Sequence, residues 1–314
     1  MKSSPGRTPV LLAFGAVYLI WGSTYLAIRF AIGTIPPLLM AGVRFLIAGS
    51  ALYAWSRGRG APRPTPAQWR AAFMVGGLLL VCGNGAVVTA EQWVPSGLTA
   101  LLVGAVPLWM VLVDWGWGMR VRPSGRVAAG LLGGFAGLAL LVGAPAAGRG
   151  GLRALVGSLL VIAGALAWAT GSIYSRHAPR PSRPRLWVSM QMLAGGMLLV
   201  PLSGLVGEWR GFHPASVSLR SMAALAYLVV FGSLVAYTAY IWLLSVSTPA
   251  RVGTYAYVNP VVALVLGWAL AGEPLSFRSV AAAAIIVGSV VVITTGGRTA
   301  REDRAVPAAG AVKR

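Results

Sequence analysis

Ten long apolar segments, separated by short loops rich in proline and arginine, constrain this chain more than any other feature. A helix needs about 20 mostly apolar residues to cross a hydrocarbon core of ~30 Å. Ten such segments use most of the 314 residues and leave no room for a soluble domain, and the 10% of charged residues are too few to cover a water-facing surface. The sequence therefore predicts an all-α integral membrane protein with ten transmembrane helices. The predicted spans are residues 9–31, 36–56, 70–92, 96–118, 125–145, 154–176, 185–206, 220–246, 250–271 and 277–296.

The basic residues are divided unequally between the two sides of this arrangement. With the N-terminus inside, 19 of the 26 lysines and arginines lie on the inner side and 6 on the outer side, and Arg44 lies within a span. Because positive charge collects in cytoplasmic loops, we expect both termini to be cytoplasmic, with residues 297–314 forming a basic tail. In a soluble protein the net charge of +20 would suggest nucleic acid. Here the basic cytoplasmic loops account for the positive charge. We therefore expect the protein to contact the lipid bilayer and not to bind nucleic acid.

The two halves of the chain resemble each other. A shift of 147 residues places Trp21–Arg29 on Trp168–Arg176, and a shift of 153 places Pro107 on Pro260. Two ungapped runs in the same order indicate a duplicated five-span unit, with repeats at 9–145 and 154–296. Since five is odd, the second unit enters the membrane in the opposite direction. Such inverted repeats are typical of secondary transporters, whose substrate site lies near the midplane, although a duplication kept for stability alone would give the same pattern.

Several residues resemble one known family. They are Trp21-Gly22-Ser23-Thr24-Tyr25, Arg44-Phe45, Pro107, Pro260, Gly272-Glu273-Pro274-Leu275 and Gly288. Together they look like the EamA-type unit of the drug/metabolite transporter superfamily, and the resemblance covers about residues 9–296. It implies a ten-helix carrier of small metabolites, often an exporter in bacteria, without naming a substrate. In this chain Glu273 matches the acid that the family carries between the last two spans of a unit, but its repeat mate is Arg120, so a symmetric role for that acid is not implied.

The two mid-span prolines, Pro107 and Pro260, are expected at corresponding depths in the two halves. Proline removes a backbone hydrogen bond and kinks a helix, and the freed carbonyl needs a protein, water or substrate partner in the bilayer. We therefore place the binding region near them, with Trp109, Tyr257 and Asn259 as neighbouring candidates. The alternative is a static packing kink, which proline often provides in membrane helices.

Arg44 lies about eight residues into the second predicted span, on a helix face that it shares with alanines. A buried arginine needs an acid, carbonyl groups or an anionic substrate group. Two roles remain open: an internal clamp, with Glu91 or backbone carbonyls as partner, or a substrate contact. The repeat mate of Arg44 is Gln191, which is therefore also a site candidate.

Aromatic and polar residues at mid-span depth complete the predicted site. Trp21 and Trp168 are repeat mates that lie away from the interfaces where tryptophan usually resides. An aromatic wall with a few polar groups suits amphipathic or zwitterionic metabolites and organic cations, although each aromatic residue alone could serve helix packing. The further candidates for this cavity lining are Tyr25, Asn84 and Tyr237.

Two acids, Glu91 and Asp114, lie near the ends of their predicted spans. Desolvation could make either a proton-coupling group, but residues at span ends are usually solvated or salt-bridged. No pair of carboxylates lies at mid-membrane, which favours facilitated exchange over a strongly proton-driven cycle.

The sequence favours a secondary transporter, for amino acids or related amphipathic metabolites, in the cytoplasmic membrane of a bacterium. The excess of arginine over lysine, with abundant alanine and glycine, indicates the bacterial source. A channel-like or uncoupled facilitator is the alternative. An intramembrane enzyme is disfavoured because we find no Ser/His dyad, paired aspartates or metal motif. With one cysteine and two histidines, we expect no metal and no cofactor. A monomer and a homodimer are both compatible with the sequence.

Overall fold

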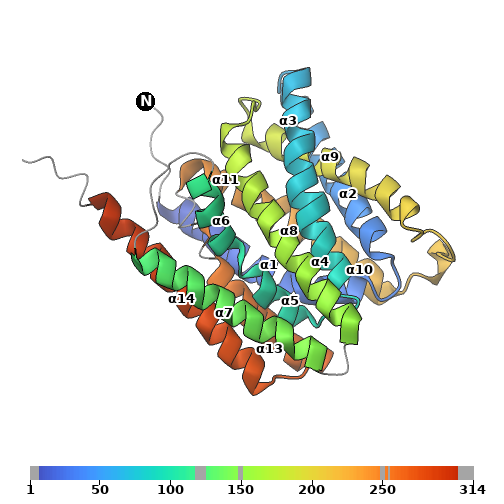
Figure 1. The fold of residues 1–314 in the computed structure, drawn as a ribbon. Coiled ribbons are helices and arrows are strands. Elements are labelled where there is room, and N and C mark those ends of the chain that lie inside the picture. The colour runs from blue at the N-terminus through green and yellow to red at the C-terminus, as the bar shows by residue number, and fades with distance from the viewer. Residues whose placement is uncertain (1–6, 117–124, 148–150, 248–251, 254, 303–314) are drawn as a thin grey trace, which may run out of the picture.

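The computed structural model describes residues 7–116, 125–147, 151–247, 252–253 and 255–302 (Figure 1). These residues form ten helical segments that agree with the ten predicted spans, and the part of the chain described contains no strand. Seven spans are single helices. They are α1 (Arg7–Ala31), α2 (Pro37–Gly58), α7 (Gly125–Ala147), α8 (Gly151–His177), α9 (Pro184–Leu205), α13 (Tyr255–Ala271) and α14 (Phe277–Glu302). The prediction of an all-α membrane fold is confirmed.

The other three spans are built from consecutive shorter pieces. They are α3 (Pro66–Gly76), η1 (Gly77–Asn84) and α4 (Gly85–Ala90) in the third span, α5 (Ser96–Val103) and α6 (Val106–Asp114) in the fourth, and α10 (Leu219–Tyr227), η4 (Leu228–Tyr237) and α11 (Thr238–Val246) in the eighth. The elements η1 and η4 are π-helices, a rare geometry that occurs mostly as short interruptions and often at functional sites. A 3₁₀ turn, η3 (Pro214–Ser216), lies between the seventh and eighth spans.

Helix starts follow from local sequence. Proline occupies the first position of α2, α3 and α9, where its missing N–H would have no intrahelical partner in any case. Before α3, the Thr65 hydroxyl accepts a hydrogen bond from the Gln68 amide, and the Gln68 side chain accepts one from the Thr65 amide. This reciprocal pair is a capping box. These signals explain why the predicted starts near residues 36 and 185 agree with the structure, while the third span begins before residue 70.

Helices of the two halves pack on each other throughout the bundle. α2 packs along α9, α1 along α13, and η1 and α4 along α8, while α7 packs along α14 at one edge (Figure 1). Small residues allow the close approach: a Cβ added to Gly76 would lie 2.6 Å from the carbonyl oxygen of Gln191, and one added to Gly49 would lie 2.9 Å from the amide of Leu193. Membrane helices associate through such small-residue contacts because lipid supplies no hydrophobic drive between them.

Pro107 and Pro260 differ in whether the helix around them is continuous. The fourth span is interrupted at Gly104 and Ala105, directly before the helix that contains Pro107, whereas α13 continues through Pro260. At the C-terminal end, α14 extends to Glu302, so the first residues of the predicted tail are helical. Residues 303–314 of that tail lie outside the described residues.

Candidate functional site

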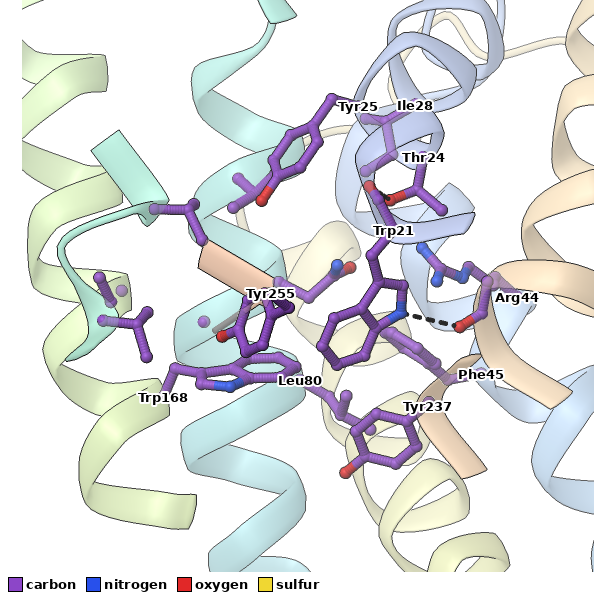
Figure 2. Close-up of a pocket in the computed structure, with 18 residues that line it drawn as sticks. Trp21, Thr24, Tyr25, Ile28, Arg44, Phe45, Leu80, Trp168, Tyr237 and Tyr255 are labelled. Carbon is purple, nitrogen blue, oxygen red and sulfur yellow. Dashed lines mark hydrogen bonds between the residues drawn. The ribbon is translucent and has the colours of Figure 1, made fainter. Parts of the chain in front are cut away.

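A cavity lies in the middle of the bundle, between the two halves of the chain. Its empty space is about 680 Å³ when the open solvent at its mouth is counted. Figure 2 shows the rings of Trp21, Trp168, Tyr237 and Tyr255 around it, with Arg44 on the far side of Trp21. The walls come from α1, α2, the third and fourth spans, α8, η4 and α13. Both halves therefore contribute to one site.

The repeat mates Trp21 and Trp168 meet at its centre. Their ring centroids are 5.6 Å apart with the planes nearly perpendicular, and Tyr240 lies 4.9 Å from Trp21 and 5.7 Å from Trp168. Hydrogen bonds fix these rings: Trp21 Nε1 donates to the Gly232 carbonyl at 3.2 Å, and Trp168 Nε1 donates to the Tyr240 hydroxyl at 3.0 Å. Edge-to-face pairs of this kind are favourable beyond their area burial. The aromatic wall is thus held rigidly before any ligand binds.

Arg44 is buried, with 4% of its surface exposed, and lines the cavity from α2. Its Nε donates to the Ser233 hydroxyl at 2.7 Å, and its guanidinium lies 4.9 Å from the centre of the Phe45 ring. Its Nη1 is buried and has no hydrogen-bond partner. Among the described residues the one ion pair joins Arg29 to Glu273 at 3.4 Å, so Glu91 is not the partner of Arg44. A cation with a free donor at a cavity wall is suited to bind an anionic group.

The π-helices bring backbone close to this site from both halves. η1 places Gly83 and Asn84 on the cavity wall, and η4 places Gly232 and Tyr237 there. A Cβ on Gly83 would lie 2.8 Å from the Trp168 ring, and one on Gly232 would lie 2.7 Å from Arg44 Nη2. Asn84 Oδ1 is buried without a hydrogen-bond partner. The site therefore contains a free acceptor besides the free donor of Arg44.

The structure brings together six of the ten residues predicted to form the cavity. Three others, Trp109, Gln191 and Asn259, do not line it, and the side chain of Tyr257 is outside the described residues. The six on the cavity wall are Trp21, Tyr25, Arg44, Asn84, Trp168 and Tyr237. Gln191 lies behind the wall, where its Oε1 accepts a hydrogen bond from the Tyr237 hydroxyl at 2.6 Å. Trp109 packs on Phe135, with ring centroids 5.2 Å apart, away from the cavity.

The last two predicted cavity residues belong to α13. With its amide in the orientation that satisfies its surroundings, Asn259 donates to the carbonyls of Tyr18 and Tyr255, at 2.9 and 3.2 Å, and so ties α13 to α1. Tyr257 lies on α13, but its side chain is outside the described residues. Asn259 thus stabilises the helix pair and does not line the cavity.

The two acids singled out in the sequence occupy opposite environments. Asp114 is exposed at the end of α6, as expected for a residue at a span end. Glu91 follows α4 and is 1% exposed, and neither carboxylate oxygen has a hydrogen-bond partner. Buried carboxylates are rarely left unpaired, so Glu91 departs from the usual pattern.

Two further acids cap helices of the other half. Glu273 accepts hydrogen bonds from the amides of Ser96 and Gly97, at 2.9 and 3.1 Å, and from the Ser96 hydroxyl at 2.8 Å. Glu208 accepts from the amides of Leu38 and Leu39 at 3.0 and 2.9 Å. Each carboxylate thus satisfies free N–H groups at the start of a membrane helix, a position that favours negative charge. Of these two acids, Glu273 was indicated by the family resemblance but without its partners, and Glu208 was not predicted as a functional residue.

Three residues at the site, Ser233, Gly232 and Gly83, were not predicted from the sequence. For the two glycines the available signal is the residue type itself, because glycine within a membrane span allows the chain to approach a bulky side chain. Ser233 carried no such signal, because one serine in an apolar helix can satisfy its hydroxyl on its own backbone.

Comparison with known proteins gives a consistent result. The EamA-like transporter family model matches residues 7–143 and 155–295, one match in each half. The inner membrane transporter YedA of Escherichia coli (strain K12) is 40% identical over 290 residues, which cover 92% of this chain and 91% of that protein. A probable amino-acid metabolite efflux pump of Salmonella typhimurium (strain LT2) is 26% identical over 306 residues, covering 92% and 95%.

The fold is shared with a solved structure. A crystal structure with 24% sequence identity superposes with a TM-score of 0.65, covering 93% of this chain and 99% of that one. At this identity the likeness shows the fold alone. The family match in each half and the high coverage of a 40% identical relative carry the assignment. This chain belongs to the EamA-like transporter family.

Proposed function

We propose that this protein is a secondary transporter that exports small amphipathic metabolites bearing a carboxylate, such as amino acids or related compounds, by alternating access. The observation that carries the proposal is the free Nη1 of Arg44 on the wall of the central cavity. An arginine donor left unpaired in a membrane interior is costly, and a substrate carboxylate would supply the missing partner through a charge-assisted hydrogen bond.

The rest of the cavity fits the other parts of such a molecule. Asn84 Oδ1 can accept a hydrogen bond from an ammonium group, and the faces of Trp21 and Trp168 can contact a cation or an apolar side chain. One end of the substrate would thus be fixed by charge while its apolar body lies against aromatic rings. The relative named as a probable amino-acid metabolite efflux pump supports this substrate class.

Inverted repeats support the alternating-access mechanism. Both halves contribute to the cavity, and Trp21 and Trp168 occupy equivalent positions in it. Two equivalent halves can adopt two similar packings that expose the site to opposite sides of the membrane. We place the repeats at 9–145 and 154–296, both termini in the cytoplasm and the protein in the cytoplasmic membrane of a bacterium.

Metabolite release and counterflow test the proposal. Cells that overproduce the protein should release carboxylate-bearing metabolites that cells producing Arg44→Met do not. In proteoliposomes, uptake of a labelled metabolite so identified should saturate and should be accelerated by the same unlabelled compound inside. Flux that does not saturate and shows no counterflow would favour the channel-like alternative. No flux for any released compound would overturn the transporter proposal.

A further inference from the structure

Glu91 is a buried acid that does not line the substrate cavity and, unlike Glu273, has no hydrogen-bond partner. Its side chain is enclosed at the junction of α4 and α5, both carboxylate oxygens are buried, and neither has a hydrogen-bond partner. An ionised carboxylate in this position would lose its hydration without compensation, whereas a neutral carboxyl group avoids most of that cost.

The charged and titratable groups around Glu91 do not neutralise it. Glu273 lies within electrostatic reach of Glu91 and carries the same charge, so it disfavours ionised Glu91, while Arg29 carries the opposite charge. Arg29 already pairs with Glu273, 3.4 Å away. On α1, Tyr25 is also within electrostatic reach and carries no positive charge.

The other elements packed against α4 add no partner. α8 carries Arg153 at its near end, where it is exposed, and α2 carries Arg44 in the cavity, where Ser233 holds its Nε. α5 contains no charged residue. Within the described structure, Glu91 therefore has no cation of its own.

Glu91 lies beside a contact that closes one end of the bundle. We call this contact the clasp: the Glu273 carboxylate with the amides of Ser96 and Gly97 and with Arg29. Next to the clasp, α5 packs on α13: a Cβ added to Gly97 would lie 3.2 Å from Leu264 Cα. In the described residues α13 packs closely on α5 but not on α6. The fourth and ninth spans thus touch at the clasp end and separate towards the other end.

We propose that Glu91 is a proton-binding site of the transporter, which holds a proton while the clasp is closed and releases it to water when α5 separates from α13. This proposal rests on the alternating-access cycle proposed above. It assigns the proton as the ion that is bound in the conformation with the clasp closed. When the clasp opens, water reaches the carboxyl group, the O–H bond breaks, and the proton leaves to solvent. The closed packing therefore binds one proton more than the open packing.

The linkage between protonation of Glu91 and closure of the clasp fixes the direction of the pH effect. Acid favours the closed clasp because closing requires a neutral Glu91, and alkaline conditions favour opening. With one linked proton, the ratio of open to closed protein rises by up to tenfold for each pH unit across the titration.

A single cysteine can report the opening without any substrate. In the Cys82→Ser background, Leu264→Cys places a thiol at the contact with Gly97, and its rate of reaction with a membrane-impermeant maleimide measures exposure. The same background with Ala215→Cys, an exposed position in the 3₁₀ turn η3, corrects for the pH dependence of the thiol itself. Glu273→Gln, which weakens the clasp, should raise the corrected rate and so shows that the reporter senses opening.

The corrected labelling rate of Leu264→Cys should rise with pH, by up to tenfold per unit. Glu91→Gln, a permanently neutral side chain of the same shape, should keep the rate low at every pH. The proposal would be overturned if the corrected labelling rate rose with pH as steeply in the Glu91→Gln variant as in the parent. It would also be overturned if the rate in the parent did not depend on pH. Monodisperse elution of each variant on size exclusion ensures that folded proteins are compared. Since no substrate is used, failure of the proposed transport function would leave this result unchanged.

Discussion

Replacement of Arg44 by methionine separates a structural from a substrate-binding role. The guanidinium makes one hydrogen bond, to Ser233, and has no acidic partner among the described residues. Removing it leaves the buried Ser233 hydroxyl without that partner, at a cost of about 1 kcal/mol. It also removes a cation whose placement at a membrane-helix centre costs roughly 2.5–3.5 kcal/mol on insertion scales. Arg44→Met should therefore stabilise the fold, by up to about 1.5–2.5 kcal/mol, or leave it unchanged.

Arg44→Met should weaken substrate binding, although it does not weaken the fold. Loss of a hydrogen bond between a charged donor and a substrate carboxylate weakens binding by about 1.5–3 kcal/mol, which corresponds to about 10- to 150-fold in the dissociation constant. The loss should be specific for the carboxylate. The parent protein should bind an amino acid much more tightly than its amide, and Arg44→Met should bind the two about equally.

Two measurements on the same purified proteins distinguish the structural role of Arg44 from the substrate-binding role. Thermal unfolding in detergent measures stability, and the shift of the unfolding temperature with each ligand measures binding. Arg44→Met with Ser233→Ala serves as the matched control, because it also removes the hydroxyl that Arg44 holds. An Arg44→Met protein that is strongly destabilised would show that the arginine is a structural clamp. Undiminished discrimination between acid and amide by a folded Arg44→Met protein would refute the carboxylate assignment.

Further predictions concern the glycines, the prolines and the topology. Gly232→Ala places a Cβ 2.7 Å from Arg44 Nη2, so it should displace the guanidinium and slow counterflow by about tenfold, whereas Gly15→Ala, which meets no atom within 4 Å, should have no effect on flux. Pro107→Ala and Pro260→Ala should both slow transport and shift the corrected Leu264→Cys labelling rate in opposite directions. Equal shifts would show that the prolines are packing features. Reporters fused after Arg63 and at the C-terminus should indicate the cytoplasm and one fused after Arg149 the outside, and a periplasmic C-terminus would contradict both the ten-span count and the inverted repeat.

The fold was predictable from the sequence because a bilayer permits few solutions. Every backbone polar group must be satisfied within the span, so a long apolar segment can only be a helix. The centre of the site was also predictable, because Trp21 and Trp168 stand out as repeat mates at a depth where tryptophan is unusual. The structure places them in direct contact.

The remaining features depend on contacts that sequence pattern does not encode. The π-helices and the free oxygens of Glu91 arise from how neighbouring helices pack, and the apolar sequence of η1 resembles that of any membrane helix. Gln191 and Asn259 have the chemistry of ligand-binding residues, yet the structure uses them to support Tyr237 and to join α13 to α1. Polarity at mid-membrane thus identified residues that support other side chains and helices as well as residues that face the cavity.

A structure of the protein determined with a transported metabolite tests the central claim most directly. The account predicts the metabolite in the cavity between the two halves, with its carboxylate within hydrogen-bond distance of Arg44 Nη1 and its apolar part against Trp21 and Trp168. A carboxylate that is turned away from Arg44, or a metabolite bound outside this cavity, would contradict it.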